Sequence, residues 1–278
     1  MTISINEREG ASEPPHVAPV GHLLHPALSG FPLTTLADGR VVGEFYHSRL
    51  ASVFQPIVKT DSKDIVGHHG FLRVASVNGE SLSPYSLFSK AIDDAALVKL
   101  DRLTRSLHAI NYFPQAGPDS KLFLNVEQRL LTTVANEHGL VFESILSELG
   151  IRPERVVISL PNAALSNPAL LVRSILSYRN RGYGVMVHVN GFADPGLGRL
   201  FMAEPHVVQI DLPAKERASQ AQIILQALKR AGFQLLARKV ETPEQATLAR
   251  ELGFDLQIGF QFGRPRTKLD ATVHRLPA

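Results

Sequence analysis

Residues 121–260 alternate short apolar runs with longer segments of helical periodicity, and this alternation limits the fold more than any other feature. The apolar runs are residues 121–126, 156–160, 183–190, 207–211, 234–239 and 255–260. Runs with no regular polar positions are typical of parallel strands that are covered on both faces. Between the last two runs, Thr242 and Pro243 are typical of a helix start and Gly253 of a helix end. The alternation therefore predicts an α/β protein built from βα units.

A hairpin precedes these units. Residues 53–58 and 65–74 read as two short strands, joined by a polar turn at residues 61–64. The segment from Tyr85 to Phe113 has apolar residues at helical spacing and predicts one long helix. With the hairpin the chain has eight predicted strands, which favours a closed βα barrel. An open doubly wound sheet is the alternative, but it usually carries a glycine-rich first turn, which this sequence lacks.

The two ends of the chain read differently from its middle. Residues 1–18 are polar and proline-containing, so we expect a disordered tail there. Residues 19–50 are more apolar, and we expect an irregular N-terminal arm that packs on the domain and is available to a partner. The barrel is expected over residues 51–268, and a C-terminal tail over residues 269–278.

The composition excludes several classes of protein. The chain has 278 residues, 44% of them hydrophobic, which is enough to bury one large core. Its net charge of +3 comes without a block of basic residues, so we expect no direct nucleic-acid binding. The absence of cysteine excludes disulfides, thiolate metal sites and thiol nucleophiles. Since no signal pattern and no apolar run of membrane-spanning length occurs, we expect a cytoplasmic protein without membrane contact.

Several short motifs along the barrel pattern resemble those of one protein family. They are Gln55-Pro56-Ile57-Val58, Gly67 with Leu72-Arg73, Leu124-Asn125-Val126, Ile210-Asp211, Val240-Glu241-Thr242, and Gly259-Phe260 with Phe262-Gly263-Arg264-Pro265. In this order and spacing they are similar to an EAL domain, over about residues 50–267. That family hydrolyses the bacterial second messenger cyclic di-GMP. Membership implies a modified TIM (β/α)8 barrel with an antiparallel first strand, which agrees with the predicted hairpin.

The sequence departs from the family pattern where that pattern carries acidic residues. The signature glutamate of the family falls on His69, whereas the asparagine that the family uses as a metal ligand is retained as Asn125. Of two glutamates on a later strand, one becomes Arg238 and only Glu241 remains. The other departures are Ser159 to Asn162, Asn190, Gly191, Gln209 and Ile258.

These departures remove the chemistry that the resemblance would imply. Hydrolysis of a phosphodiester with hard divalent ions needs several oxygen ligands, mostly carboxylates, and a polarised water. The replaced positions supply no carboxylate, and Arg73 and Arg238 are expected to make the mouth of the barrel positive, which opposes the entry of a cation. We therefore expect no enzyme activity, no catalytic residue, no bound metal and no cofactor.

The histidines of the sequence suggest two other candidate metal sites. His69 and His188, together with Asn125, are able to hold a transition metal if all three face the barrel interior, which would make the protein an enzyme with new metal chemistry. Interior polar residues that satisfy one another are the favoured interpretation. His22 and His25 have metal-ligand spacing, but no third ligand is near, so we interpret them as loop histidines.

The positions retained from the family define a vestigial ligand site. Its members are Gln55, Arg73, Asn125, Arg238 and Glu241, although Arg73 is equally suited to an ion pair with Glu241. The resemblance favours a catalytically inactive regulator in bacterial signalling, which acts by binding a regulatory protein and is also suited to form a homodimer. A receptor that binds cyclic di-GMP without hydrolysing it is the alternative.

Overall fold

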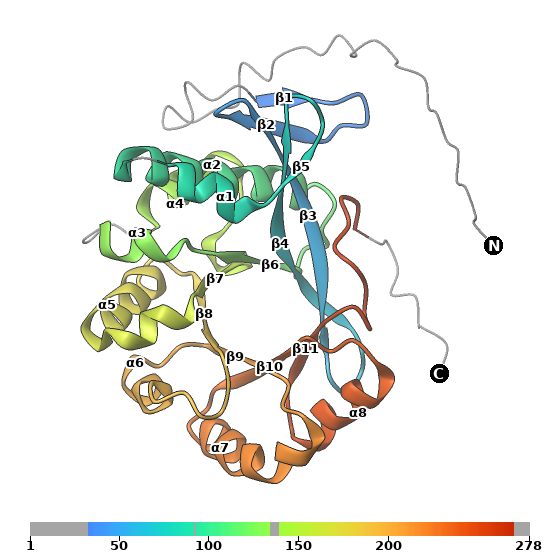
Figure 1. Cartoon of the computed structure of the whole chain (residues 1–278), viewed down its shortest axis with the longest axis vertical. Helices are drawn as coiled ribbons and strands as arrows, with labels where there is room; N and C mark the ends of the chain where they lie inside the picture. Colours follow the sequence, from blue (N-terminus) through green and yellow to red (C-terminus); the bar gives the residue numbers. More distant parts are fainter. Residues whose placement is uncertain (1–32, 92, 134–138, 270–278) are drawn as a thin grey trace, which may run out of the picture.

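The computed structural model describes residues 33–91, 93–133 and 139–269, and within them an 11-stranded sheet forms the framework (Figure 1). The order of the strands in the sheet is β1-β2-β3-β11-β10-β9-β8-β7-β6-β4-β5, with an additional pairing of β3 with β4. The strands are β1 Leu33–Thr35, β2 Val41–Phe45, β3 Ser48–Lys59, β4 Ile65–Ser76, β5 Ser81–Leu82, β6 Lys121–Asn125, β7 Val156–Leu160, β8 Gly184–Val189, β9 Val207–Asp211, β10 Gln234–Arg238 and β11 Leu256–Ile258.

The pairing of β3 with β4 closes part of this sheet into a barrel. Strands β4 and β6 to β11 run parallel to one another, whereas β3, which lies between β4 and β11, is antiparallel to both. A closed ring of this kind is a TIM-like α/β barrel with an antiparallel first strand. The predicted fold class is therefore confirmed, and the open doubly wound sheet is excluded.

The helices lie on the outside of the barrel (Figure 1). They are α1 Pro84–Lys90, α2 Asp94–Tyr112, α3 Gln128–Thr133, α4 Leu140–Glu148, α5 Pro168–Arg179, α6 Leu200–Ala203, α7 Ala218–Arg230 and α8 Pro243–Glu251. Short 3-10 helices occur at Pro153–Arg155, Asn162–Ser166, Leu197–Arg199 and Lys215–Arg217.

The single helix predicted over residues 85–113 is wrong, because the structure divides it into α1 and α2. Ala91 leaves the helical region, with φ −66° and ψ 99°. The side chain of Asp93 then accepts a hydrogen bond from the N–H of Ala96 and begins a new helix. An apolar period continues across such a break, so periodicity alone does not reveal it.

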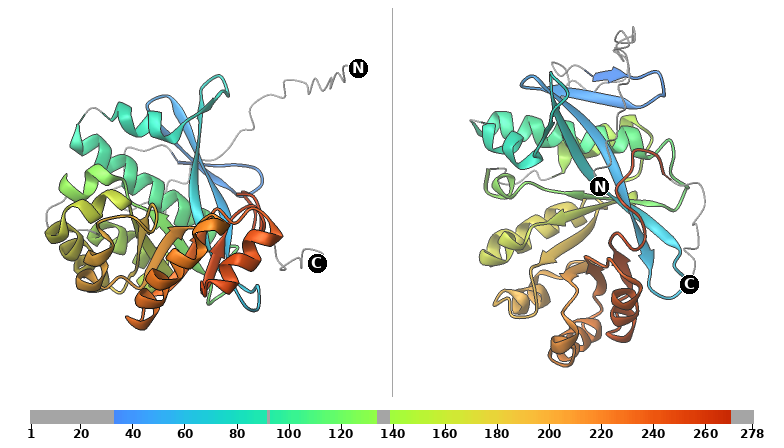
Figure 2. Two further views of the ribbon diagram at one scale, coloured as in Figure 1. Left: turned by 60° about the horizontal axis from the view of Figure 1, so that its bottom comes forward. Right: turned by 45° about the vertical axis from the view of Figure 1, so that its right-hand side comes forward.

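The expected irregular arm is also wrong for the part of it that the structure describes. Strands β3 and β4 continue past the barrel and form an antiparallel extension with β1, β2 and β5 (Figure 1 and Figure 2). The apolar side chains of β2 pack toward α2, where Gly43 lies against Leu103. The boundary expected at residue 51 therefore falls inside β3. Residues 1–32 and 270–278 lie outside the described residues, and with them the predicted N-terminal tail, His22, His25 and most of the C-terminal tail.

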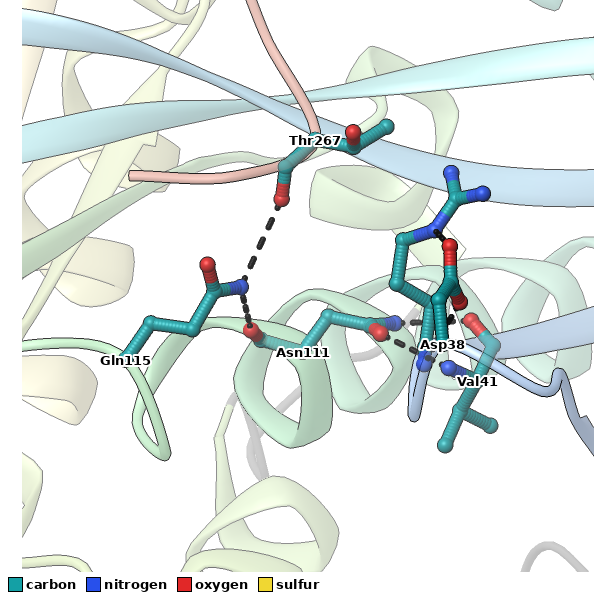
Figure 3. A network of polar contacts seen from close by, with 6 residues as sticks. Asp38, Val41, Asn111, Gln115 and Thr267 are labelled. Carbon is teal, nitrogen blue, oxygen red and sulfur yellow. Dashed lines mark hydrogen bonds and ion pairs between the residues drawn. The ribbon is translucent and has the colours of Figure 1, made fainter. Parts of the chain in front are cut away.

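The end of α2 joins two distant parts of the chain (Figure 3). The amide of Asn111 accepts from the N–H of Val41 at 2.8 Å and donates to the carbonyl of the same residue at 2.8 Å, so it completes the hydrogen bonding of β2. One turn later, Gln115 donates to the carbonyl of Thr267 at 3.4 Å and accepts from the N–H of Leu269 at 3.1 Å. The C-terminal segment is thus held against α2.

The interior of the barrel is filled by two successive layers of side chains. The lower layer is apolar and consists of Ile57, Phe123, Val157, Met186, Val207, Leu236 and Leu256, with Gly67 at the corresponding position of β4. A side chain at Gly67 would collide with the carbonyl of Lys121, so only glycine allows β4 and β6 to approach this closely. Residues two positions farther toward the mouth lie on the same inward face of each strand and form the upper layer.

Candidate functional site

The upper layer surrounds a cavity of about 310 Å3 at the carboxyl ends of the parallel strands. Each barrel strand contributes its upper-layer side chain to the lining, and β4 also contributes Phe71; the upper-layer residues are Gln55, His69, Asn125, Ser159, His188, Gln209, Arg238 and Ile258. The rest of the lining consists of Val126, Pro161, Lys239, Glu241, Gly259 and Phe260. Ligand sites of barrel proteins lie at this end, so the cavity is the candidate site.

The structure brings together four of the five residues predicted for the ligand site. Gln55, Asn125, Arg238 and Glu241 line the cavity, and the amide of Gln55 also donates to the carbonyl of Gly263 at 3.0 Å. Arg73 does not line the cavity. It lies four residues beyond His69 on β4, where the strand has left the barrel, and its side chain is exposed. The predicted ion pair of Arg73 with Glu241 does not form among the described residues.

A second correction concerns the end of β8. The sequence placed Asn190 and Gly191 at the mouth, but β8 ends at Val189 and neither residue lines the cavity. The backbone N–H of Asn190 donates instead to the side chain of Asn162. His188 is the inward residue of this strand, and it pairs in register with Gln209 of β9.

His69 is a neutral side chain held by Asn125. Its Nε2 lies 3.0 Å from Oδ1 of Asn125, and since that oxygen only accepts, the proton of the neutral ring is on Nε2. Burial lowers the pKa of His69 to about 4, although the hydrogen bond to Asn125 opposes this. The ring stacks on Phe71, with centroids 4.7 Å apart. The position at which the resemblance places a glutamate therefore carries no charge at neutral pH.

The positive mouth that we expected is partly compensated by Asp211, whose single negative charge faces both Arg238 and Lys239. Nε of Arg238 lies 2.6 Å from Oδ1 of Asp211, and Nζ of Lys239 lies 2.7 Å from its Oδ2. Burial of Asp211 opposes its ionisation, but the hydrogen bonds from Arg238 and Lys239 outweigh this and hold the pKa of the carboxyl below its ordinary value. Sequence reasoning found Asp211 as a motif residue but missed its partners. The pairing depends on the register of β9 and β10, which places Asp211 beside Arg238.

His188 and Gln209 complete the inner wall. Burial lowers the pKa of His188, and the nearby Arg238 lowers it further, so this histidine is also neutral at pH 7. Gln209 is only 2% exposed. Neither side chain supplies a negative charge to the cavity.

The donor set does not fit a pair of hard divalent cations. Glu241 is the one carboxylate in the lining of the cavity, and it is exposed at the rim. The retained Asn125 already uses its oxygen to accept from His69. Within residues 33–91, 93–133 and 139–269, no group of three or more histidine, cysteine, aspartate and glutamate side chains is placed to hold a metal. Hard cations bind through six or more oxygens, several of them carboxylates.

No helix in the described part of the chain is long and apolar enough to cross a bilayer.

Comparisons with known proteins agree with this architecture. The family model described as "EAL domain" matches residues 42–265. The uncharacterized protein Rv1357c of Mycobacterium tuberculosis is 22% identical over 236 residues, which cover 80% of this chain and 75% of the relative.

Two solved structures show the same fold. One is the YkuI protein of Bacillus subtilis, with an EAL domain, in complex with substrate c-di-GMP and calcium, at 23% identity and a TM-score of 0.68. The other is Klebsiella pneumoniae BlrP1 in a calcium and cy-diGMP complex, at 19% identity and a TM-score of 0.66. The matches cover 80% and 79% of this chain, but only 56% and 57% of the solved chains. This chain thus spans little more than half the length of those proteins.

Proposed function

Because the chain belongs to the EAL domain family, we propose that it is a regulatory protein of cyclic di-GMP signalling that does not hydrolyse the nucleotide and acts by binding another protein. The solved structures of YkuI and BlrP1 are both complexes with cyclic di-GMP and calcium. The proposal concerns what this chain does with the same barrel.

One observation carries the first part of the proposal: the ring of eight strand residues around the cavity contains no carboxylate. The position of the signature glutamate is a neutral histidine, and the nearby Asp211 already pairs with Arg238 and Lys239. Without several anionic ligands, two divalent cations are not held and no water is activated by them. Loss of a single electrostatic stabiliser commonly lowers the rate of an enzyme about a hundredfold or more. In this chain all the family carboxylates of the eight-residue ring are replaced.

A hydrolysis assay tests this part directly. Purified protein is incubated with cyclic di-GMP and Mg2+ or Mn2+, and the linear dinucleotide is separated by chromatography. We expect no product above the buffer control, while an active phosphodiesterase of the family, run in parallel, converts the substrate. Metal-dependent turnover that disappears in Glu241→Gln contradicts the proposal.

Support for a protein partner comes from apolar side chains exposed at the end of the antiparallel extension. Tyr46 and Val77 are 53% and 76% exposed, and Tyr85, at the start of α1 and three residues after β5, is 81% exposed. Ser48 pairs with Ser76, so the turn that carries Tyr46 lies beside the turn that carries Val77. Large apolar groups exposed close together are typical of a surface that another protein covers.

Photo-cross-linking in cells tests the partner proposal. A photoreactive phenylalanine analogue replaces Tyr85, and the same analogue at the exposed Glu251 of α8 is the matched control. We expect a discrete cross-linked species from position 85 that is absent from position 251. Equal labelling from both positions contradicts a partner at this surface. The homodimer stays a prediction, which light scattering of the purified protein checks.

A receptor that binds cyclic di-GMP without turnover is a second candidate, favoured by the cavity itself. The mouth of the barrel holds a cavity of about 310 Å3, and among the described residues the ion pair of Arg238 uses its Nε, which contacts Asp211, and not its terminal nitrogens. Guanidinium groups are suited to bind phosphate. Calorimetric titration with cyclic di-GMP, with and without Mg2+, decides between the candidates: saturable binding lost in Arg238→Leu favours the receptor, and its absence leaves the adaptor.

A further inference from the structure

Two Asn-Gly pairs occur in the sequence, Asn78-Gly79 and Asn190-Gly191, and both follow a valine. An asparagine before a glycine can lose its side-chain amide without an enzyme, because glycine has no Cβ to keep its backbone nitrogen away from the asparagine side chain. Both asparagines are exposed and lie outside the helices and strands. Whether either pair reacts in the folded protein therefore depends on the backbone N–H of its glycine.

The N–H of Gly79 is held in the turn between β4 and β5. It donates to the carbonyl of Ser76 at 2.9 Å, and the N–H of Glu80 donates to the hydroxyl of Ser76 at 3.2 Å. Gly79 also has a φ of 82°, which lies in the left-handed region that favours glycine. The nitrogen of Gly79 must therefore break a hydrogen bond before it reaches the side chain of Asn78.

The N–H of Gly191 has no hydrogen bond among the residues that the structure describes. The backbone just before it is fixed, because the N–H of Asn190 donates to Oδ1 of Asn162 at 3.0 Å directly after the end of β8. Around Gly191 the space is open, since a methyl group at this position would meet no atom within 4 Å. The nitrogen of Gly191 therefore approaches the side chain of Asn190 without breaking a hydrogen bond.

The side chain of Asn190 also interacts with His188. Burial lowers the pKa of His188, whereas a hydrogen bond with the side chain of Asn190 acts in the opposite direction. A bond with this effect favours the protonated ring, so the ring of His188 donates and the amide oxygen of Asn190 accepts. A donor at this oxygen stabilises the negative charge that develops there when a nucleophile adds to the amide carbon.

From these contacts we propose that Asn190 is a site of spontaneous deamidation, which converts it into aspartate or isoaspartate and adds a carboxylate beside His188 in the wall of the cavity. The nitrogen of Gly191 bonds to Cγ of Asn190, and the side-chain nitrogen takes up the proton of Gly191 and leaves as ammonia. One water then opens the five-membered imide at either of its carbonyls. This covalent change is independent of the regulatory role proposed above.

Peptide mapping of the full chain, aged in buffer at pH 8, compares the two pairs within one molecule. Trypsin releases residues 74–90 and 182–199, and each of these peptides has one asparagine and no glutamine, so the mass change from amide to acid identifies the residue that reacted. We expect Asn190 to react at least about fivefold faster than Asn78, which is the usual effect of one hydrogen bond that must break first. Chromatography separates the aspartate product from isoaspartate.

Two controls separate the fold from the local sequence. In urea the turn at Gly79 is lost, and the two rates are expected to converge, because both pairs follow a valine. Gly191→Ala adds a Cβ that hinders closure of the imide but meets no neighbour, so it is expected to slow the reaction at position 190 severalfold and to leave that at Asn78 unchanged. No reaction at Asn190, or a rate no higher than that of Asn78, overturns the proposal. A difference that persists in urea contradicts the structural argument.

The position of the new carboxylate has a readout of its own. Asn190→Asp reproduces one of the two products, and NMR of protein labelled with 15N-histidine follows the titration of His188. A carboxylate in place of the amide is expected to raise the pKa of His188 by about one pH unit or more, since a nearby opposite charge favours the charged ring. A pKa of His188 that is the same in Asn190→Asp and in the unaged protein contradicts the proposed contact.

Discussion

His69 is the residue on which the interpretation of this barrel depends. It takes the position of an acidic signature residue, yet it is buried, neutral and bonded to Asn125. A neutral imidazole bonded in this way fills the barrel as an interior polar residue. The lack of carboxylates around the cavity therefore arises from several strands together, and the exchange of one residue does not restore the full set.

Restoring the glutamate is expected to leave the protein inactive. In His69→Glu the neighbouring Ser159, His188 and Gln209 still provide no carboxylate, so a divalent pair lacks most of its ligands. Chromatography of cyclic di-GMP incubated with Mn2+ checks this, and thermal melting shows whether the variant is folded. Turnover by this single variant would contradict the view that the whole set of ligands is missing.

Acidification is expected to destabilise the fold through its buried histidines. Burial lowers the pKa of His69 to about 4 and that of His108 to about 3, from an ordinary value of 6.5. Because the folded values are lower, the unfolded chain binds more protons as the pH falls below 6.5, and stability drops from there toward pH 4. Each fully buried histidine contributes on the order of 3 kcal/mol to this loss.

Urea unfolding at pH 7 and pH 5 measures the effect. His108→Leu removes one of the two groups, together with its hydrogen bond to Ser52, and is expected to flatten the dependence on pH while lowering the stability at pH 7. An unchanged free energy of unfolding between the two pH values in the native protein would show that these histidines are not neutral in the fold.

At the scale of secondary structure, strands were predicted better than the boundaries of helices. Strands β7 and β9 have the bounds that the sequence indicated, since their apolar runs end at polar or proline residues. Strands β1 and β2 were missed. β1 is only three residues long, with two threonines, and β2 has no clean alternation of apolar and polar residues; β2 gains a partner only because β3 continues beyond the barrel.

The link between α2 and β2 provides a test at this scale. Asn111→Ala leaves the N–H and the carbonyl of Val41 without their partner in a buried position. We expect a loss of about 2–3 kcal/mol in the free energy of unfolding, since each unpaired buried group costs about 1–3 kcal/mol. Gln115→Ala is the milder control, because that side chain is exposed and its bond to Thr267 is long at 3.4 Å.

Hydrogen exchange separates a local from a global effect. The amide of Val41 is expected to exchange faster in Asn111→Ala than in Gln115→Ala, while amides of β7 keep their protection. If both variants lose the same free energy of unfolding, the two hydrogen bonds between Asn111 and Val41 do not stabilise the fold more than the contacts of Gln115 do.

At the scale of the whole molecule, the sequence predicted the barrel and most of the residues at its mouth, but not their relations. Gln55, Asn125 and Arg238 were chosen from the motifs that resemble the EAL family, and the two-residue period of each strand explains why all three line the cavity. The pairing of Arg238 with Asp211 depends on the register between two strands, and the exposure of Arg73 depends on where β4 leaves the barrel. Neither is visible in one sequence.

The central claim is that this barrel no longer assembles a divalent metal site, and titration with Mn2+ followed by electron paramagnetic resonance tests it most directly. With protein in excess, we predict that the signal of the free hydrated ion persists up to about 1 mM protein, since a lone exposed carboxylate binds such ions weakly. Stoichiometric loss of that signal, absent in Glu241→Gln, would contradict the claim and show that the barrel binds a divalent metal, as metal-dependent members of the family do.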